Sequence, residues 1–119
     1  MGTARAVPGV TVPPIRRLGQ ADLPGCLALA ADRQWAAEER KWSLLLRIGE
    51  VYGVDDPAGG LAGTVVLTRY GHRLAAVGMM LVASRHGRRG LGQALMTHAV
   101  RAAAGATVFL YATAQGRPL

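Results

Sequence analysis

The sequence is poor in cysteine, lysine and aromatic residues, and each shortage excludes or disfavours a class of protein. Cys26 is the only cysteine, so no disulfide can form within the chain and a disulfide-stabilised secreted domain is excluded. Aromatic residues make up 5% of the chain and Lys41 is the only lysine. This composition disfavours a nucleic-acid-binding module, in which aromatic side chains stack on bases between basic residues.

Long apolar runs are also missing. The longest, Leu74–Ala83, has the length of a strand and is far below the roughly 20 residues that span a bilayer. Residues 1–14 hold glycines and prolines without the apolar block of a secretory signal, and they predict a loose lead-in. We therefore expect no membrane-spanning helix, a cytoplasmic location, and one folded domain over residues 15–119.

The net charge of +7 comes almost entirely from arginine. A basic protein attracts polyanions, which include both nucleic acids and phosphate-bearing small molecules. Most of the arginines are scattered over several predicted elements, but Arg85, Arg88 and Arg89 form a tight cluster framed by glycines. This cluster is the candidate anion-binding segment.

The spacing of apolar residues predicts helices in the first half, strands in the middle, and then one more helix and strand. Helices are expected from Leu23, after Asp22, and over Ala36–Ile48 before Gly49. Strands are expected over Ile15–Leu18, Glu50–Val54, Leu61–Tyr70, Leu74–Ala83 and Thr107–Ala112, with a helix from Leu91 to Gly105 before the last of them. The prediction is an α+β fold with one mixed, mostly antiparallel sheet flanked by helices.

The segment after Val82 carries the chemistry, because an apolar strand leads there into a loop with Gly87, Gly90 and Gly92 and then into a helix. Glycines let backbone N–H groups approach a ligand, and the first turn of a helix offers free N–H groups that favour anions. A Walker loop does not fit because the loop has no lysine. A dinucleotide-binding fingerprint does not fit because Leu95 stands at the third glycine position and no acidic residue follows Asp56.

The same segment resembles motif A of the GNAT acyltransferases, in which a strand ends in Val and a Gln/Arg-x-x-Gly-x-Gly/Ala loop opens a helix. Val82 matches the end of the strand, Gly90 and Gly92 match the two small positions, and Leu95 matches the aliphatic residue on the helix. Gly87 departs from the pattern, since the family usually has Gln or Arg there. The order of predicted elements from Ile15 onward is also similar to that of the family.

The resemblance implies a GNAT-like fold and an N-acetyltransferase that uses acetyl-CoA as cosubstrate, with no metal. Acetyl-CoA would lie between the strand that ends at Val82 and the strand Thr107–Ala112, which splay apart in the family. The acceptor would be a small-molecule or peptide amine, and homodimerisation stays open. The residues implied to bind the coenzyme, by pantetheine pairing or through amides that hold the pyrophosphate, are Leu81, Val82, Gly87, Arg88, Arg89, Gly90, Leu91, Gly92 and Gln93.

The sequence identifies no catalytic base or acid. The helix that commonly carries the tyrosine acid of the family, and its last two strands, are missing from the sequence, which stops at Leu119, so the resemblance implies a C-terminally incomplete GNAT-like fold. Three hypotheses stay open: an active N-acetyltransferase, a truncated chain that binds coenzyme A without transfer or together with a partner chain, and a basic nucleic-acid-binding module. Glu38, Glu39 and Glu50 are candidate acceptor-site carboxylates, and His98 is expected at the edge of the core.

Overall fold

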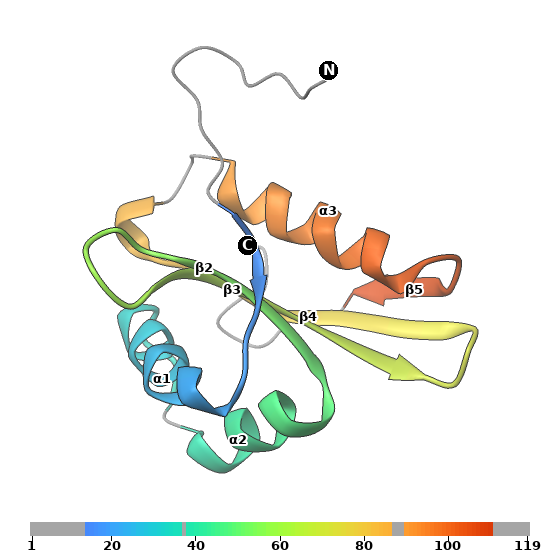
Figure 1. The fold of residues 1–119 in the computed structure, drawn as a ribbon, viewed down its shortest axis with the longest axis horizontal. Coiled ribbons are helices and arrows are strands. Elements are labelled where there is room, and N and C mark those ends of the chain that lie inside the picture. Colours follow the sequence, from blue (N-terminus) through green and yellow to red (C-terminus); the bar gives the residue numbers. More distant parts are fainter. Residues whose placement is uncertain (1–13, 37, 87–89, 111–119) are drawn as a thin grey trace.

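A five-stranded mixed sheet organises the chain in the computed structural model, which describes residues 14–36, 38–86 and 90–110 (Figure 1). The strands follow one another across the sheet in the order β1-β2-β3-β4-β5. The first four pair antiparallel, and β5 pairs parallel with β4. The strands are β1 (Arg16–Arg17), β2 (Glu50–Asp55), β3 (Leu61–Tyr70), β4 (Leu74–Val82) and β5 (Thr107–Leu110). The predicted mixed, mostly antiparallel sheet is confirmed.

Three helices cover the two faces of this sheet (Figure 1). They are α1 (Leu23–Asp32), α2 (Glu39–Ile48) and α3 (Leu91–Ala103), with short 3₁₀ turns η1 (Gln20–Asp22) and η2 (Ser84–His86). The start of α2 was predicted three residues too early. The chain turns sharply after α1, where Gln34 has a φ of 64° and the Trp35 N–H donates back to the Ala30 carbonyl (2.9 Å), so the next helix begins later.

Asp22 marks the start of α1, as predicted, and it is the N-cap residue of the helix. The helix begins after it, with Pro24 in the first turn, but the Asp22 side chain does not cap that helix. Its carboxylate instead accepts the Gly19 N–H (2.9 Å) and two hydrogen bonds from Arg16. The acidic side chain therefore joins the first helical turn to β1.

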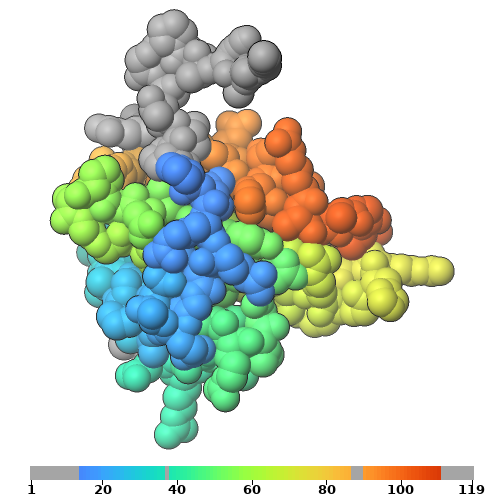
Figure 2. Space-filling view, in the orientation of Figure 1, coloured from blue at the N-terminus to red at the C-terminus, as the bar shows by residue number. Residues whose placement is uncertain are grey.

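Each face of the sheet has its own apolar cluster. On the side of α1 and α2, Trp42 is fully buried together with Cys26, Val51 and Met79. On the other side α3 packs Leu95 against a set of strand residues that includes Ala62, Val65, Leu67, Ala75 and Val77. In Figure 2, α1 and α2 (blue to green) and α3 with β5 (orange) lie on different sides of the molecule. None of the helices in the described ranges has the length and apolarity that crossing a membrane requires.

Candidate functional site: the opening between β4 and β5 and the start of α3

The parallel pair at one side of the sheet is incomplete. Within the described residues, β5 pairs with β4 only from Leu74↔Thr107 to Val77↔Leu110. The second half of β4, from Gly78 to Val82, pairs with β3 on one side. On its other side no described strand pairs with it. Among the described residues, the backbone N–H and C=O groups on that side therefore have no strand partner, and they are of the kind that a strand-like ligand pairs with.

A β-bulge in β4 coincides with this opening. Thr64 pairs with Leu81 and Val66 pairs with Gly78, so two residues of β4, Met79 and Met80, stand opposite Val65. Met79 adopts a φ of 51°, a left-handed conformation that is strained for a residue with a side chain. Its carbonyl accepts the hydroxyl of Thr64 (3.3 Å), which is itself fully buried.

The bulge changes which face of the sheet each β4 side chain meets. Val77 and Met80, three positions apart, both pack on the α3 side, whereas Met79 packs on the side of α1 and α2. In a regular strand, successive side chains point to opposite faces of the sheet, so residues three positions apart would lie on opposite faces. The apolar run Leu74–Ala83, which predicts a buried strand, hides this change of alternation because every residue in it is apolar or glycine.

Beyond β4, the chain enters α3 through two glycines with different roles. Gly90 is the N-cap residue of α3 and has a φ of 78°, a conformation that favours glycine. Gly92 lies in the first turn, where an added Cβ would be 3.6 Å from Val82 Cγ2, an ordinary contact. Among the described residues, no side chain caps the helix at Gly90, and N–H groups in the first turn of a helix favour an anion.

The structure brings six of the nine predicted coenzyme-binding residues to this junction. Leu81 and Val82 end β4, and Gly90, Leu91, Gly92 and Gln93 begin α3. The Leu91 side chain is buried in the core, so it can offer only its backbone. The other three predicted residues, Gly87, Arg88 and Arg89, lie outside the described residues.

Arg85 does not stand free beside the helix start, as its place in the arginine cluster predicts. Its Nε donates to Asp56 Oδ2 (2.8 Å), and its Nη2 forms a second, short contact with the same oxygen. His86 Nε2 lies 2.9 Å from that oxygen as well. No sequence pattern marked Asp56 as a site residue, and it stands out there only as the last acidic residue of the chain.

Asp56 is buried although it begins a turn at the surface. Its side chain is 3% exposed, and its Oδ1 accepts the Ala58 N–H (2.9 Å). The Ala58 N–H, the Arg85 guanidinium and the His86 ring hold the pKa of this carboxyl at about 2. The carboxylate is therefore charged at neutral pH and compensated on several sides.

The first residue of η2 is tied to α1 in the same way. The Ser84 N–H donates to Asp32 Oδ2 (2.8 Å), and Arg33 Nη1 donates to the Ser84 hydroxyl (3.1 Å). The Ser84 N–H lowers the pKa of Asp32. The segment Ser84–His86 is thus held between the end of α1 and the turn after β2.

Glu50 and His98 belong to a different part of the molecule. Glu50 forms an ion pair with Arg69, which lowers its pKa, and accepts the Tyr52 hydroxyl (2.8 Å). The His98 ring packs edge-on against Tyr52, with 4.5 Å between the ring centroids. His98 is half-buried, which confirms its predicted place at the edge of the core. Arg69 Nη2 also donates to the Ala102 carbonyl (2.7 Å), so this network joins α3 to the sheet.

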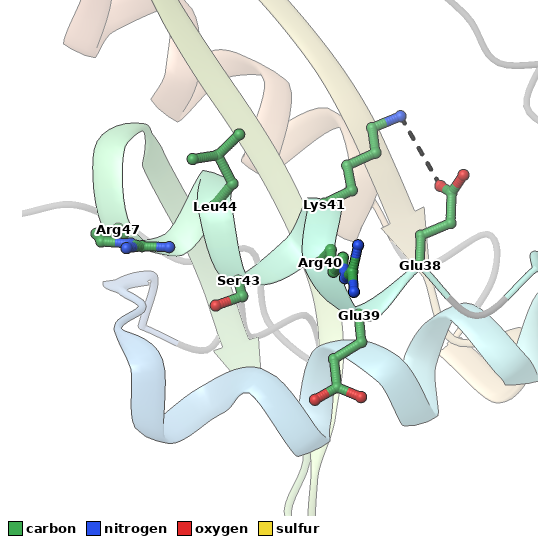
Figure 3. Close-up of a pocket in the computed structure, with 7 residues that line it drawn as sticks. All are labelled: Glu38, Glu39, Arg40, Lys41, Ser43, Leu44 and Arg47. Atoms are coloured by element: carbon green, nitrogen blue, oxygen red, sulfur yellow. Dashed lines mark ion pairs between the residues drawn. The ribbon is translucent and has the colours of Figure 1, made fainter.

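Glu38 and Glu39 lie on the outer side of α2. They line a hollow of about 960 Å³ whose described walls come from α2 and the residue before it (Figure 3). Glu38 lies 3.8 Å from the Lys41 ammonium, and both glutamates are exposed. Within the described ranges, no group of three His, Cys, Asp or Glu side chains could hold a metal ion.

Comparison with known proteins supplies the family. A model of the acetyltransferase (GNAT) family matches residues 17–117. The chain belongs to this family. A comparison with curated protein sequences found no significant match.

Solved structures of GNAT acetyltransferases share the fold. Rv2747 from Mycobacterium tuberculosis, in complex with CoA and NLQ, superposes with a TM-score of 0.70 at 18% identity over 82% of this chain and 63% of its own. The ribosomal-protein-S18-alanine N-acetyltransferase from Escherichia coli gives a TM-score of 0.72 at 20% identity, over 82% of this chain and 64% of its own. A putative GNAT acetyltransferase from Novosphingobium aromaticivorans is 27% identical, with a TM-score of 0.66 over 91% of this chain and 46% of its own.

These comparisons also give the extent of the chain. It spans less than two thirds of the length of each of these three proteins. The predicted GNAT-like fold is confirmed for the part that is present.

Proposed function

We propose that this chain binds acetyl-CoA in the opening between β4 and β5 and transfers the acetyl group to an amine. The observation that carries the proposal is the coincidence of three features at one place. In the described part of the chain, pairing with β5 ends at Val77, the bulge at Met79 follows two residues later, and α3 begins at Gly90 without a described side-chain cap. The pantetheine arm of coenzyme A is extended like a strand and ends in phosphates, so it matches the order of these features along the chain.

The pantetheine arm would pair with the open side of β4. Amide groups in that arm can exchange hydrogen bonds with backbone N–H and C=O groups near Leu81 and Val82, as a neighbouring strand would. Neither residue needs a polar side chain for this role. The apolar character of β4 is therefore compatible with coenzyme binding.

The pyrophosphate would lie at the start of α3. The free N–H groups of Leu91, Gly92 and Gln93 and the positive end of the helix dipole favour an anion there. Gly87, Arg88 and Arg89 complete the proposed site from the sequence pattern. Support also comes from the fold neighbour from M. tuberculosis, which was solved in complex with CoA.

The reaction would join the amine nitrogen to the thioester carbonyl carbon and break the carbon–sulfur bond. The amine loses one proton and the coenzyme A thiolate gains one, so the transfer needs a route for one proton and a donor that polarises the carbonyl. The bulge turns the backbone of β4 at Met79 beside the opening. A backbone N–H of this part of β4 is the donor that the proposal assigns to the thioester oxygen.

One observation favours a second candidate, a chain that binds coenzyme A without transferring the acetyl group by itself. No residue of β4 carries an ionisable side chain. Two titratable groups near the end of β4, Asp56 and His86, already contact one another. A partner chain or a water chain would then have to carry the proton.

The third candidate, nucleic-acid binding, has less support. Several arginines that contribute to the net charge have acidic partners in the structure: Arg16 contacts Asp22 and Asp55, Arg69 contacts Glu50, and Arg85 contacts Asp56. Paired arginines contribute less to a continuous phosphate-binding surface.

Two measurements on the 119-residue chain test the proposal. Calorimetric titration with CoA, with tripolyphosphate as the control anion, should give saturable binding to CoA alone. Release of free thiol from acetyl-CoA, followed with a thiol reagent across a panel of amines and peptides, should then separate the first two candidates. Binding without amine-dependent thiol release supports the second, and the absence of CoA binding rejects both.

A further inference from the structure

We infer that Asp56 is a positioning residue for the coenzyme-binding segment. It would hold the turn after β4 so that the chain reaches α3 in the geometry that binds the pyrophosphate. The inference rests on the proposed function, and it concerns a residue that lies outside motif A. Asp56 is 26 positions before Val82 in the sequence but contacts the chain directly after that strand.

The Asp56 side chain contacts two segments, its own turn and η2. Its Oδ2 receives the Arg85 guanidinium through two nitrogen atoms and lies 2.9 Å from His86 Nε2. Its Oδ1 accepts the Ala58 N–H of its own turn (2.9 Å). One buried carboxylate therefore joins the β2–β3 turn to two consecutive residues of η2.

The other side of η2 is held by α1. Asp32 accepts the Ser84 N–H, and Arg33 donates to the Ser84 hydroxyl. The His86 N–H also donates to the Ala83 carbonyl (2.8 Å), and the Ala83 N–H donates to Ala62 of β3 (2.8 Å). The turn Ser84–His86 is thus fixed from two directions, and only residues 87–89 separate it from Gly90 at the start of α3.

A fixed turn favours binding because a loop that is already ordered loses less freedom when the ligand arrives. Fixing the backbone of one residue costs a factor of about 5 to 30 in an equilibrium constant. Because Ser84–His86 is already held, the ligand does not have to order these residues. Removing the Asp56 charge would release Arg85 and His86, and binding would then include the cost of ordering them.

An opposing effect must be weighed against this one. The Arg85 side chain is 60% exposed, so a freed guanidinium would turn toward an anion and could strengthen its binding. One additional charge about 10 Å from a phosphate in water changes affinity by only about twofold. The loss of loop order is expected to exceed this gain.

The experiment compares three substitutions by calorimetric titration with CoA at a temperature where every variant is folded. Asp56→Asn keeps an oxygen that can accept the Ala58 N–H but removes the charge. Arg85→Gln removes the same ion pair from its exposed partner, so it tests the inference even if Asp56→Asn does not fold. Asp55→Asn is the matched control, because the neighbouring Asp55 also pairs with an arginine, but this arginine is Arg16 of β1 and not a residue of η2.

We expect Asp56→Asn and Arg85→Gln each to raise the CoA dissociation constant about tenfold, and the double variant to be no weaker than the weaker single one. Asp55→Asn should stay within about twofold of the parent chain. The affinity for pantetheine, which has no phosphate, should not change in any variant. A CoA affinity within twofold of the parent for both Asp56→Asn and Arg85→Gln, tighter binding, or an equal loss for CoA and pantetheine would overturn the inference.

Hydrogen exchange on the ligand-free chain separates this inference from the proposed function. The amides of Ser84–His86 and Leu91–Gln93 should exchange at least fivefold faster in Asp56→Asn than in the parent or in Asp55→Asn. If the parent chain binds no CoA, the proposed function fails, and faster exchange still shows that Asp56 holds the turn. Unchanged exchange overturns the inference whether or not CoA binds.

Discussion

Val77 and Leu110 form the last pair that joins β4 to β5 in the described part of the chain, and the strained residue Met79 follows two positions later. The bulge therefore lies directly after the last described pair of β4 and β5, and bulges bend a strand. Thr64 holds the Met79 carbonyl from the β3 side. The opening in the sheet is thus built into β4 and β3 themselves, and the start of α3 at Gly90 lies at its end.

The two glycines of α3 should respond differently to alanine. Gly90 has a φ of 78°, so Gly90→Ala should lower the free energy of unfolding by about 1–2 kcal/mol and weaken CoA binding. Gly92 has helical geometry and room for a Cβ, so Gly92→Ala should leave stability unchanged or raise it by up to about 1 kcal/mol. Urea denaturation measures both. Equal effects of the two substitutions would contradict the assigned backbone roles.

Gly63 allows α3 to approach the sheet closely. A Cβ at this position would lie 2.9 Å from Leu95 Cδ1 and 3.1 Å from the Leu81 carbonyl oxygen. Gly63→Ala should therefore destabilise the fold by about 1–3 kcal/mol, since Leu95 and its neighbours are tightly packed. Gly19→Ala is the control because a Cβ there meets no atom within 4 Å. A urea midpoint for Gly63→Ala equal to that of Gly19→Ala would show that the helix can shift without cost.

Cys26 should be unreactive in the folded chain. It is fully buried, and burial raises the pKa of its thiol to about 12, so almost no thiolate exists at pH 8. Reaction with a disulfide reagent at pH 8 should proceed at the rate of unfolding and accelerate with urea. The urea-unfolded chain is the control and should react at once. Fast labelling without urea would contradict the burial of Cys26 in the apolar cluster that α1 and α2 form with the sheet.

The sequence predicted the order of the elements because each has a clear apolar period. The helix from Leu91 was placed correctly because its apolar residues recur at helical spacing. The strand Leu61–Tyr70 was placed correctly because it is rich in β-branched residues. The glycines of motif A were also recognisable, because a loop that turns into a helix beside a ligand needs them. Six of the nine candidate residues consequently meet at one junction.

Long-range polar contacts could not be predicted in the same way. Asp56 lies in the turn before β3 and Arg85 in the turn after β4, and the two turns meet at the open end of the β3–β4 pair, where Gly63 pairs with Val82. No local sequence pattern marks this contact. The bulge at Met79 was hidden for a related reason, since an all-apolar strand gives no alternation that could reveal a change of register. The sequence therefore predicted that the Arg85 cation is free, whereas in the structure Arg85 forms an ion pair with Asp56.

Asp56 should make the fold sensitive to acid. Its folded pKa of about 2 lies below its ordinary value of 3.8, so the unfolded chain takes up the proton first as the pH falls. The stability that this carboxylate contributes is therefore complete above about pH 4 and is lost as the pH falls toward 2. Asp56→Asn should lower stability at neutral pH and flatten the loss of stability over this window. Urea midpoints from pH 6 to pH 2 measure the slope, with Glu39→Gln as the control because Glu39 is an exposed carboxylate on α2. A profile for Asp56→Asn that runs parallel to that of the parent chain would mean that other carboxylates, such as Asp22 and Glu50 with their arginine partners, carry the acid sensitivity instead.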